Sequence, residues 1–319
     1  MNPSPIDSVR ASGPIFLAGI DRSGIGLLGD LLDAHPAFAL SRRTNFWTFY
    51  DGRFGDLAES SNLDACVRSL MRYRRIRDLG LDPGSLRETF LASPERTYGR
   101  LFALIGEQHA LIRGKRRWGD KSLGSERHAD RILGSYPDAR MVHMIRDPRD
   151  RHASVTSHRG AKRGGSAGTS AEWRDSVRLA ERNAARHEQH YRVIRYEDLV
   201  AEPREVMEAV CGFFGEPLDE AVLVPLQSSH DTTPAIHALS VGRFRSDLDP
   251  GQVAFIERLL GRDITRRGYA LTHPDLRPAE RVLLEALTIP IGRLLMAGCR
   301  PWSKAKSRLA EPSARRLLD

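Results

Sequence analysis

The sequence has few cysteines and no long run of apolar residues. Its three cysteines, Cys66, Cys211 and Cys299, lie far apart and match neither a disulfide framework nor metal-ligand spacing, so we expect reduced thiols and no metal site. The apolar runs, such as that at residues 15–20, are too short to cross a bilayer. Residues 1–12 lack the apolar stretch of a secretory signal. These absences predict a cytoplasmic protein.

Positive charge is in excess. The chain has 49 lysines and arginines against 41 acidic residues, a formal net charge of +8, which favours an anionic partner. Composition alone leaves nucleic acid, a membrane surface and a multiply charged small molecule open. The arginines are spread along the chain and do not alternate with aromatic residues, and no nucleic-acid-binding motif occurs, so we expect no nucleic-acid partner.

Short apolar runs alternate with longer helical stretches along the chain. Residues 15–18, 141–145 and 191–194 have the length and the flanking turns of buried strands. This alternation predicts an α/β fold in three layers, with a central parallel sheet flanked by helices. The apolar spacing predicts helices at residues 25–34, 125–135, 149–158, 171–190 and 202–214.

Three further segments have distinct compositions. Residues 51–110 are arginine-rich and predict a helical insertion beside a substrate pocket, whereas the glycines and serines of residues 162–170 predict a surface loop. Residues 272–319 contain an apolar helix candidate at 280–296 followed by a basic stretch. Two interpretations of this C-terminal helical, basic extension stay open, a docked helix and an interfacial contact with a membrane.

A turn with a glycine at each end, residues 19–24, follows the first predicted strand and leads into a helix. Backbone N–H groups of such a turn and of the helix N-terminus converge on an anion. A nucleotide triphosphatase needs lysine and then serine or threonine after the second glycine. Ile25 and Gly26 occupy those positions, so a magnesium-dependent ATPase or kinase is disfavoured, and Arg22 is the cation within the turn.

A second candidate anion site follows the predicted strand at residues 141–145. Arg146 comes directly after the strand, Pro148 can start a helix, and Ser154 lies on the first turns of that helix. Because a guanidinium matches phosphate oxygens bidentately, Arg146 and Ser154 can grip one phosphate from two sides. The residues alone also allow a surface ion pair between Arg146 and Asp147 or Asp150.

The two motifs together resemble those of the sulfotransferases that use 3′-phosphoadenosine 5′-phosphosulfate (PAPS). Residues 14–36 are similar to the family's 5′-phosphosulfate loop, and residues 141–154 are similar to its 3′-phosphate motif. The resemblance extends over residues 1–271, the expected sulfotransferase domain. It implies a P-loop-like fold, PAPS as the donor cofactor with PAP as product, and transfer of a sulfuryl group to a hydroxyl or amine of a carbohydrate, lipid or small-molecule acceptor.

The resemblance also implies roles for single residues. The implied cofactor-binding residues are Arg22, Ser23, Gly24, Ile25, Gly26, Arg146, Ser154, Tyr196 and Arg243. The implied catalytic residues are Lys121 and Arg22, and Asp120 beside Lys121 is a further catalytic candidate that this sequence itself offers. Lys121 is the candidate that stabilises charge in the transition state, because family members place a lysine near the transferring group at this point of the chain.

The general base is where the chain departs from the family. Many relatives carry a glutamate soon after the first helix, and this chain has Arg43 there. Asp120, Asp51 and His35 are the substitutes that the sequence offers, or Arg43 recognises an anionic acceptor and another group takes the proton. Two functions therefore stay open, an active sulfotransferase and a non-catalytic protein that binds PAP or PAPS.

Overall fold

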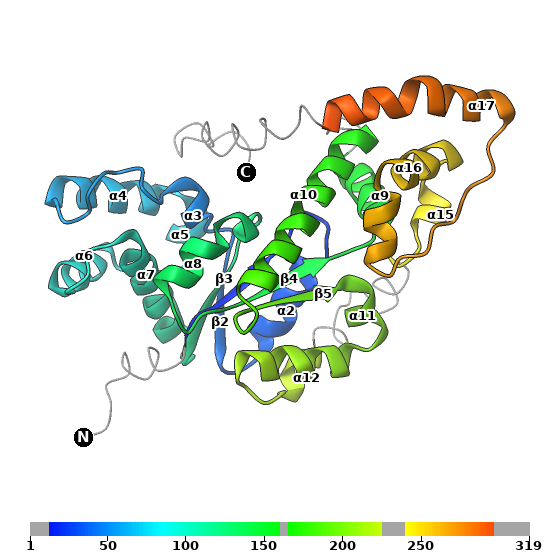
Figure 1. Ribbon diagram of the computed structural model, residues 1–319. Coiled ribbons are helices and arrows are strands. Elements are labelled where there is room, and N and C mark those ends of the chain that lie inside the picture. Colours follow the sequence, from blue (N-terminus) through cyan, green and yellow to red (C-terminus); the bar gives the residue numbers. More distant parts are fainter. Residues whose placement is uncertain (1–12, 160–164, 225–239, 297–319) are drawn as a thin grey trace.

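Five parallel strands form one sheet in the order β2-β3-β1-β4-β5 (Figure 1). The computed structural model describes residues 13–159, 165–224 and 240–296. The strands are β1 (Ile15–Ala18), β2 (Phe38–Arg42), β3 (Arg117–Lys121), β4 (Arg140–Ile145) and β5 (Tyr191–Arg195). The α/β fold with a central parallel sheet is thus confirmed. The strand order reverses at β1, which is where ligands bind in open sheets of this kind, at the carboxyl ends of the strands.

Helices cover both faces of the sheet (Figure 1). The first half of the chain contributes α2 (Ile25–Ala34), α3 (Phe46–Phe49), α4 (Ser60–Arg72), α5 (Arg74–Arg77), α6 (Pro83–Ala92), α7 (Tyr98–Ile112), η1 (Ser125–His128) and α8 (Ala129–Ser135). The second half contributes α9 (Pro148–Arg159), α10 (Gly165–Arg186), α11 (Tyr196–Ala201), α12 (Pro203–Phe214), η2 (Glu220–Leu223), α15 (Phe244–Asp247), α16 (Pro250–Arg266), α17 (Pro278–Leu283) and η3 (Leu284–Thr288). Within these described residues no helix has the length and apolar character needed to cross a membrane.

The central strand β1 is buried on both faces because successive side chains alternate between them. Phe16 and Ala18 belong to the hydrophobic cluster under α3–α8, whereas Ile15 and Leu17 belong to the cluster under α2, α11 and α12. A third cluster joins α9, α10, α15 and α16 to the C-terminal helix. The region from α4 to α7 is helical, as predicted for the insertion.

The sequence missed two strands and misassigned one loop. β2 and β3 lie in segments for which no strand was predicted. The loop predicted at residues 162–170 is wrong from Gly165 onward, because Gly165 to Ser170 form the first turns of α10, and residues 162–164 lie outside the described residues. His152 of α9 explains this, since its ring nitrogens bond the hydroxyls of Thr169 (2.8 Å) and Ser166 (3.1 Å).

Candidate functional site

The turn between β1 and α2 forms the first half of the site. Gly19 and Gly24 have φ angles of 141° and 96°, and Arg22 between them has a φ of 67°, which is uncommon for a non-glycine residue. Gly24 has no room for a side chain, because a Cβ there would lie 2.3 Å from the Tyr196 ring. The turn leads into the ten-residue α2, whose first N–H groups lack intrahelical partners and favour an anion.

Ser23 contributes a buried hydroxyl to this turn. Its Oγ atom has no hydrogen-bond partner among the described residues. An unpaired buried polar group costs about 1–3 kcal/mol, so a bound oxyanion that pairs with it would remove that cost. The turn therefore fits a phosphate or phosphosulfate group on the basis of its own atoms.

Arg146 follows β4 and forms the second half of the site. Its guanidinium is buried, donates to the carbonyl oxygens of Arg22 (3.4 Å) and Ser240 (2.5 Å), and lies 4.5 Å from the centre of the Tyr196 ring. Its Nε has no partner among the described residues. Burial raises the pKa of Tyr196, so the ring that bridges Arg146 and Gly24 stays neutral.

The two halves meet at Arg22 and Ser154. The Nε of Arg22 donates to Ser154 Oγ at 2.8 Å across 132 residues of sequence. Ser154 is buried on α9, the helix that Arg146 precedes. Because β1 and β4 are hydrogen-bonded neighbours, their carboxyl ends bring both candidate anion-binding motifs to one place.

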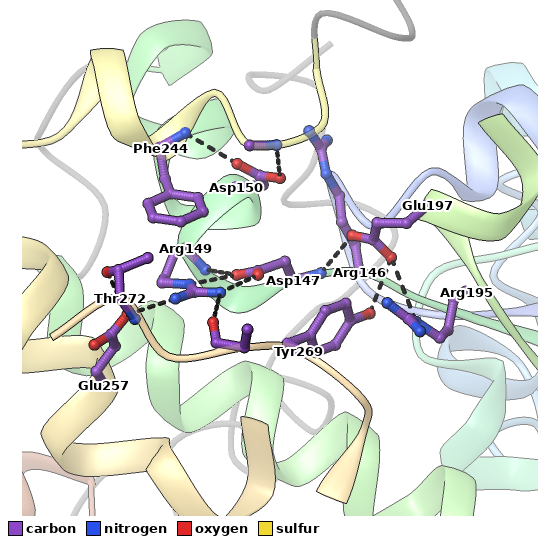
Figure 2. Close-up of polar contacts among 12 residues, drawn as sticks. Arg146, Asp147, Arg149, Asp150, Arg195, Glu197, Phe244, Glu257, Tyr269 and Thr272 are labelled. Atoms are coloured by element: carbon purple, nitrogen blue, oxygen red, sulfur yellow. Dashed lines mark hydrogen bonds and ion pairs between the residues drawn. The ribbon is translucent and has the colours of Figure 1, made fainter. Parts of the chain in front are cut away.

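A buried ion network fixes the turn after β4 (Figure 2). Asp147 accepts hydrogen bonds from Arg149 at 3.0 Å and 2.6 Å, and Arg149 also donates to Glu257 of α16 at 2.5 Å. The Asp147 N–H donates to Glu197 at 2.9 Å. The sequence left open an ion pair between Arg146 and Asp147. In the structure Arg149 pairs with Asp147 instead, and Arg146 faces the Arg22 turn.

Asp150 connects α9 to the segment that begins at Ser240. Its carboxylate accepts from the N–H groups of Gly242 (2.7 Å) and Phe244 (2.9 Å), as Figure 2 shows. Burial raises the pKa of Asp150, while these N–H groups oppose the shift. The connection holds Ser240 where its carbonyl meets Arg146.

Arg243 faces a different part of α9. It donates to Asp247 at 2.8 Å and 2.5 Å and to the Ser157 hydroxyl at 3.3 Å. Ser157 lies one turn of α9 beyond Ser154, so Arg243 contacts α9 one turn away from the site residue Ser154.

Lys121 ends β3 and crosses α2 at Gly29. A Cβ at Gly29 would lie 2.6 Å from Lys121 Cδ and 3.1 Å from its Nζ, so glycine is what lets the lysine lie there. Ile25 and Gly26 form the N-terminus of α2, and Gly29 lies one helical turn further along the helix. Burial, followed by the charge of Arg42, lowers the pKa of Lys121. The ammonium is thus held beside α2, near the turn.

Asp120 lies on the opposite side of β3 and is buried. Its Oδ1 accepts from Ser41 Oγ and Thr44 Oγ1, both at 2.8 Å, and burial raises its pKa. The other substitutes for the base are also engaged. Asp51 pairs with Arg131, and His35 bonds the Pro217 carbonyl and the Ala37 N–H, each at 3.0 Å.

Two titratable residues that the sequence did not single out lie on η1. Glu126 is fully buried and accepts the Gly19 N–H at 3.2 Å, and burial raises its pKa. His128 bonds the Thr48 hydroxyl at 3.3 Å, and burial lowers its pKa. Both were predicted only as part of a helix at 125–135, because nothing in the local pattern shows that η1 packs against the turn after β1.

No curated protein matches the chain, whereas several solved structures do. The sulfotransferase domain of the olefin synthase of Synechococcus PCC 7002 is 22% identical over 86% of this chain and 94% of that chain, with a TM-score of 0.47. The sulfotransferase domain of the curacin biosynthetic pathway is 17% identical over 82% and 99%, with a TM-score of 0.49. Mouse sulfotransferase SULT7A1 complexed with PAP is 13% identical over 84% and 94%, with a TM-score of 0.44.

The parallel sheet brings a glycine-flanked turn and a buried arginine to adjacent strand ends, an arrangement of an α/β protein that fits an anion. The family assignment comes from the sequence model of the sulfotransferase family, which matches residues 14–220, more than half of the chain. The chain belongs to the sulfotransferase family and is a sulfotransferase.

Proposed function

We propose that the protein transfers a sulfuryl group from PAPS to a hydroxyl or amine of a carbohydrate, lipid or small-molecule acceptor. The observation that carries this proposal is the contact between the two anion-binding motifs, from Arg22 to Ser154 and from Arg146 to the Arg22 carbonyl. An adenosine bisphosphate has one anionic group at each end. Two adjacent cationic clamps match that charge distribution better than they match a single phosphate.

The proposed donor contacts follow from the geometry of the turn and of α9. Arg22, Ser23 and Gly24 hold the 5′ end together with the N–H groups of Ile25 and Gly26 at the start of α2. Arg146 and Ser154 hold the 3′-phosphate, and Tyr196 supplies a face beside the adenosine. Arg243 lies at the rim and would reach the 3′-phosphate only by exchanging its bonds to Asp247.

When bound, PAPS supplies an activated sulfuryl group on a phosphate oxygen that leaves with the nucleotide. Arg22 and the N-terminus of α2 stabilise the negative charge that gathers on this oxygen. Lys121 is the second cation for that charge, because it lies along the same helix and is partly desolvated. We propose these three groups as the electrostatic part of the mechanism.

Arg43 is our candidate for orienting an anionic acceptor. Its side chain is exposed, and its backbone N–H donates to the Lys121 carbonyl at 2.8 Å, which anchors it next to the proposed transfer site. Asp120, Asp51 and His35 hold hydrogen bonds or an ion pair within the fold. A non-catalytic PAP-binding protein is the second candidate function, because each of these three groups already has a partner within the fold.

We also propose that the protein acts in the cytoplasm in contact with a membrane surface. Cys66 and Cys211 are free and buried, which suits a reducing compartment. The membrane contact is proposed for the C-terminal extension at 272–319, whose described helix is apolar and whose last residues are basic.

Transfer of radiolabelled sulfate from PAPS into a lysate of the native host tests the function. We expect labelled product with the native chain and at least a roughly hundredfold loss with Arg22→Ala, since Arg22 acts at both the donor site and the leaving oxygen. Arg68→Ala, an exposed arginine on α4, is the matched control and should retain activity. PAP binding without any labelled product would favour the non-catalytic protein instead.

A further inference from the structure

The C-terminal helix exposes a continuous apolar face. It runs from α17 through the π-helical turn η3 and on through residues 289–296. Six of the nine large apolar side chains that are exposed in the described residues lie on it, each between 46% and 73% exposed. They are Val282, Leu283, Leu287, Ile291, Leu294 and Leu295. Single exposed apolar residues are ordinary, whereas such a cluster marks an interaction surface.

The opposite face of the same helix is already used for docking. Leu284, Ile289 and Met296 are buried in the cluster with α16, and Gly292 packs so closely that a Cβ there would lie 2.5 Å from the Phe255 ring. The π-helical turn inserts one residue, so Leu284 and Ile289, five apart, face the same side. The described part of the C-terminal extension thus packs on α16, and its exposed apolar face has no partner among the described residues.

Basic side chains border the exposed face. Arg293 lies on the helix itself and is exposed, and Arg258 and Arg262 are exposed one turn apart on α16. Arg258 pairs with Glu285 at 2.6 Å, so these two opposite charges offset each other. Residues 297–319, which continue from the helix, contain six lysines and arginines against two acidic residues.

We infer that this face is the surface by which the protein lies on an anionic lipid bilayer. The inference rests on the proposed membrane contact and identifies the side chains that make this contact. Apolar side chains on one face of a helix enter the headgroup boundary, while basic neighbours are attracted to anionic lipids. The apolar cluster and the basic border together match this partner.

A second copy of the chain matches the face less well. In a symmetric dimer each face meets itself, so the positive border that includes Arg262 and Arg293 would face an equally positive border on the other copy. Like charges held close together oppose such a contact, whereas an anionic bilayer attracts every one of them. The charge pattern therefore selects the bilayer.

Co-sedimentation of the full chain with vesicles tests the inference. We expect binding to vesicles of equal parts phosphatidylcholine and phosphatidylglycerol, and much weaker binding to phosphatidylcholine alone. The variant Leu283→Gln/Leu287→Gln/Leu294→Gln should lose more than about tenfold in partitioning, because all three side chains are solvent-exposed in the fold and apolar in the contact. Ile112→Gln, an equally exposed apolar residue on α7, is the control and should bind normally.

A charge variant provides a second, independent arm. Arg262→Gln/Arg293→Gln should lower partitioning onto the anionic vesicles by about fivefold for each arginine and leave the thermal midpoint unchanged. PAP binding and sulfate transfer to a soluble acceptor, measured on the same variants, should stay at the native level. If the native chain itself showed neither PAP binding nor sulfate transfer, that result would count against the proposed function and not against the proposed membrane-binding face.

Three results would overturn the inference. The first is equal partitioning onto neutral and anionic vesicles, and the second is normal binding by the triple glutamine variant. The third is a native dimer, seen by light scattering, that the triple variant converts to a monomer, since a second copy would then cover the face.

Discussion

Ser23 carries a buried polar atom that no hydrogen bond within the described residues explains. Its hydroxyl is unpaired among the described residues, so Ser23→Ala should leave the thermal midpoint of the unbound protein unchanged or slightly higher. PAP affinity should fall by about 1.5–3 kcal/mol if the hydroxyl bonds a charged phosphate. Calorimetry and thermal melts measure the two effects separately.

Ser41→Ala is the matched control for that prediction. The Ser41 hydroxyl is also buried, but it donates to the Gly119 carbonyl (3.1 Å) and to Asp120 (2.8 Å). Its removal should lower the thermal midpoint with little effect on PAP affinity. A lower midpoint for Ser23→Ala as well would show that its hydroxyl serves the fold and not a ligand.

Glu126 gives a pH dependence of stability. Burial raises the pKa of its carboxyl in the folded state, so the folded protein holds the proton more tightly than the unfolded chain does. Its contribution to stability is therefore full at pH values below the unfolded pKa and is lost as pH rises through the folded pKa. Glu126→Gln mimics the protonated acid, so in melts from about pH 4 upward its midpoint should gain on the native one as pH rises above about 4.3, the pKa of a glutamate in an unfolded chain.

Melts of Glu205→Gln over the same range provide the control, since this residue is exposed on α12. A difference between Glu126→Gln and the native chain that stays constant with pH, or that shrinks as pH rises, would contradict a raised pKa for Glu126.

Single residues also show how far sequence reasoning reaches. Arg22, Arg146 and Ser154 were predicted because their spacing relative to strands and helices is local, and the structure brings them into contact. Asp120 was predicted as a catalytic candidate next to Lys121. Its hydrogen bonds come from Ser41 on β2 and from Thr44, just after the end of that strand. Such partners are set by the pairing of β2 with β3, which no local pattern contains.

At the scale of elements, the N-terminus of α2 offers a matched pair of glycines. Gly24→Ala should destabilise the protein by about 1–3 kcal/mol, because φ is 96° and a Cβ would lie 2.3 Å from the Tyr196 ring. Gly26→Ala should stabilise it by about 0.4–1 kcal/mol, because this helical glycine has nothing within 4 Å of its Cβ position. Denaturant unfolding measures both, and equal effects would contradict the described packing of the turn.

Of the two strands that the sequence missed, β3 has a clear physical reason. β3 contains Arg117, Asp120 and Lys121 in five residues, which is an unusual composition for a buried strand. Arg117 is accommodated in the buried strand because it donates to the Gly13 carbonyl at 2.6 Å. Glycine is needed at position 119 because a Cβ there would lie 2.5 Å from the Ile15 side chain. Both reasons are tertiary contacts, whereas β1, β4 and β5 have apolar runs that show in the sequence.

At the scale of the whole molecule, the sheet order explains the position of the site. β1 and β4 are adjacent in space but more than a hundred residues apart in sequence, and α4–α7 and β3 lie between them in the chain. The carboxyl ends of both strands open to the same edge, where the Arg22 turn, the Arg146 turn and Tyr196 converge. The α/β class follows from the alternation of elements, but this convergence depends on strand order.

The claim that two clamps hold one adenosine bisphosphate is tested most directly by calorimetry with PAP and with adenosine 5′-phosphate. The native chain should prefer PAP, and Arg146→Ala should weaken PAP binding by about 1.5–3 kcal/mol while it changes binding of the 5′-phosphate much less. The preference for the 3′-phosphate would then largely disappear in the variant. An Arg146→Ala variant that keeps the full preference for PAP would contradict the account.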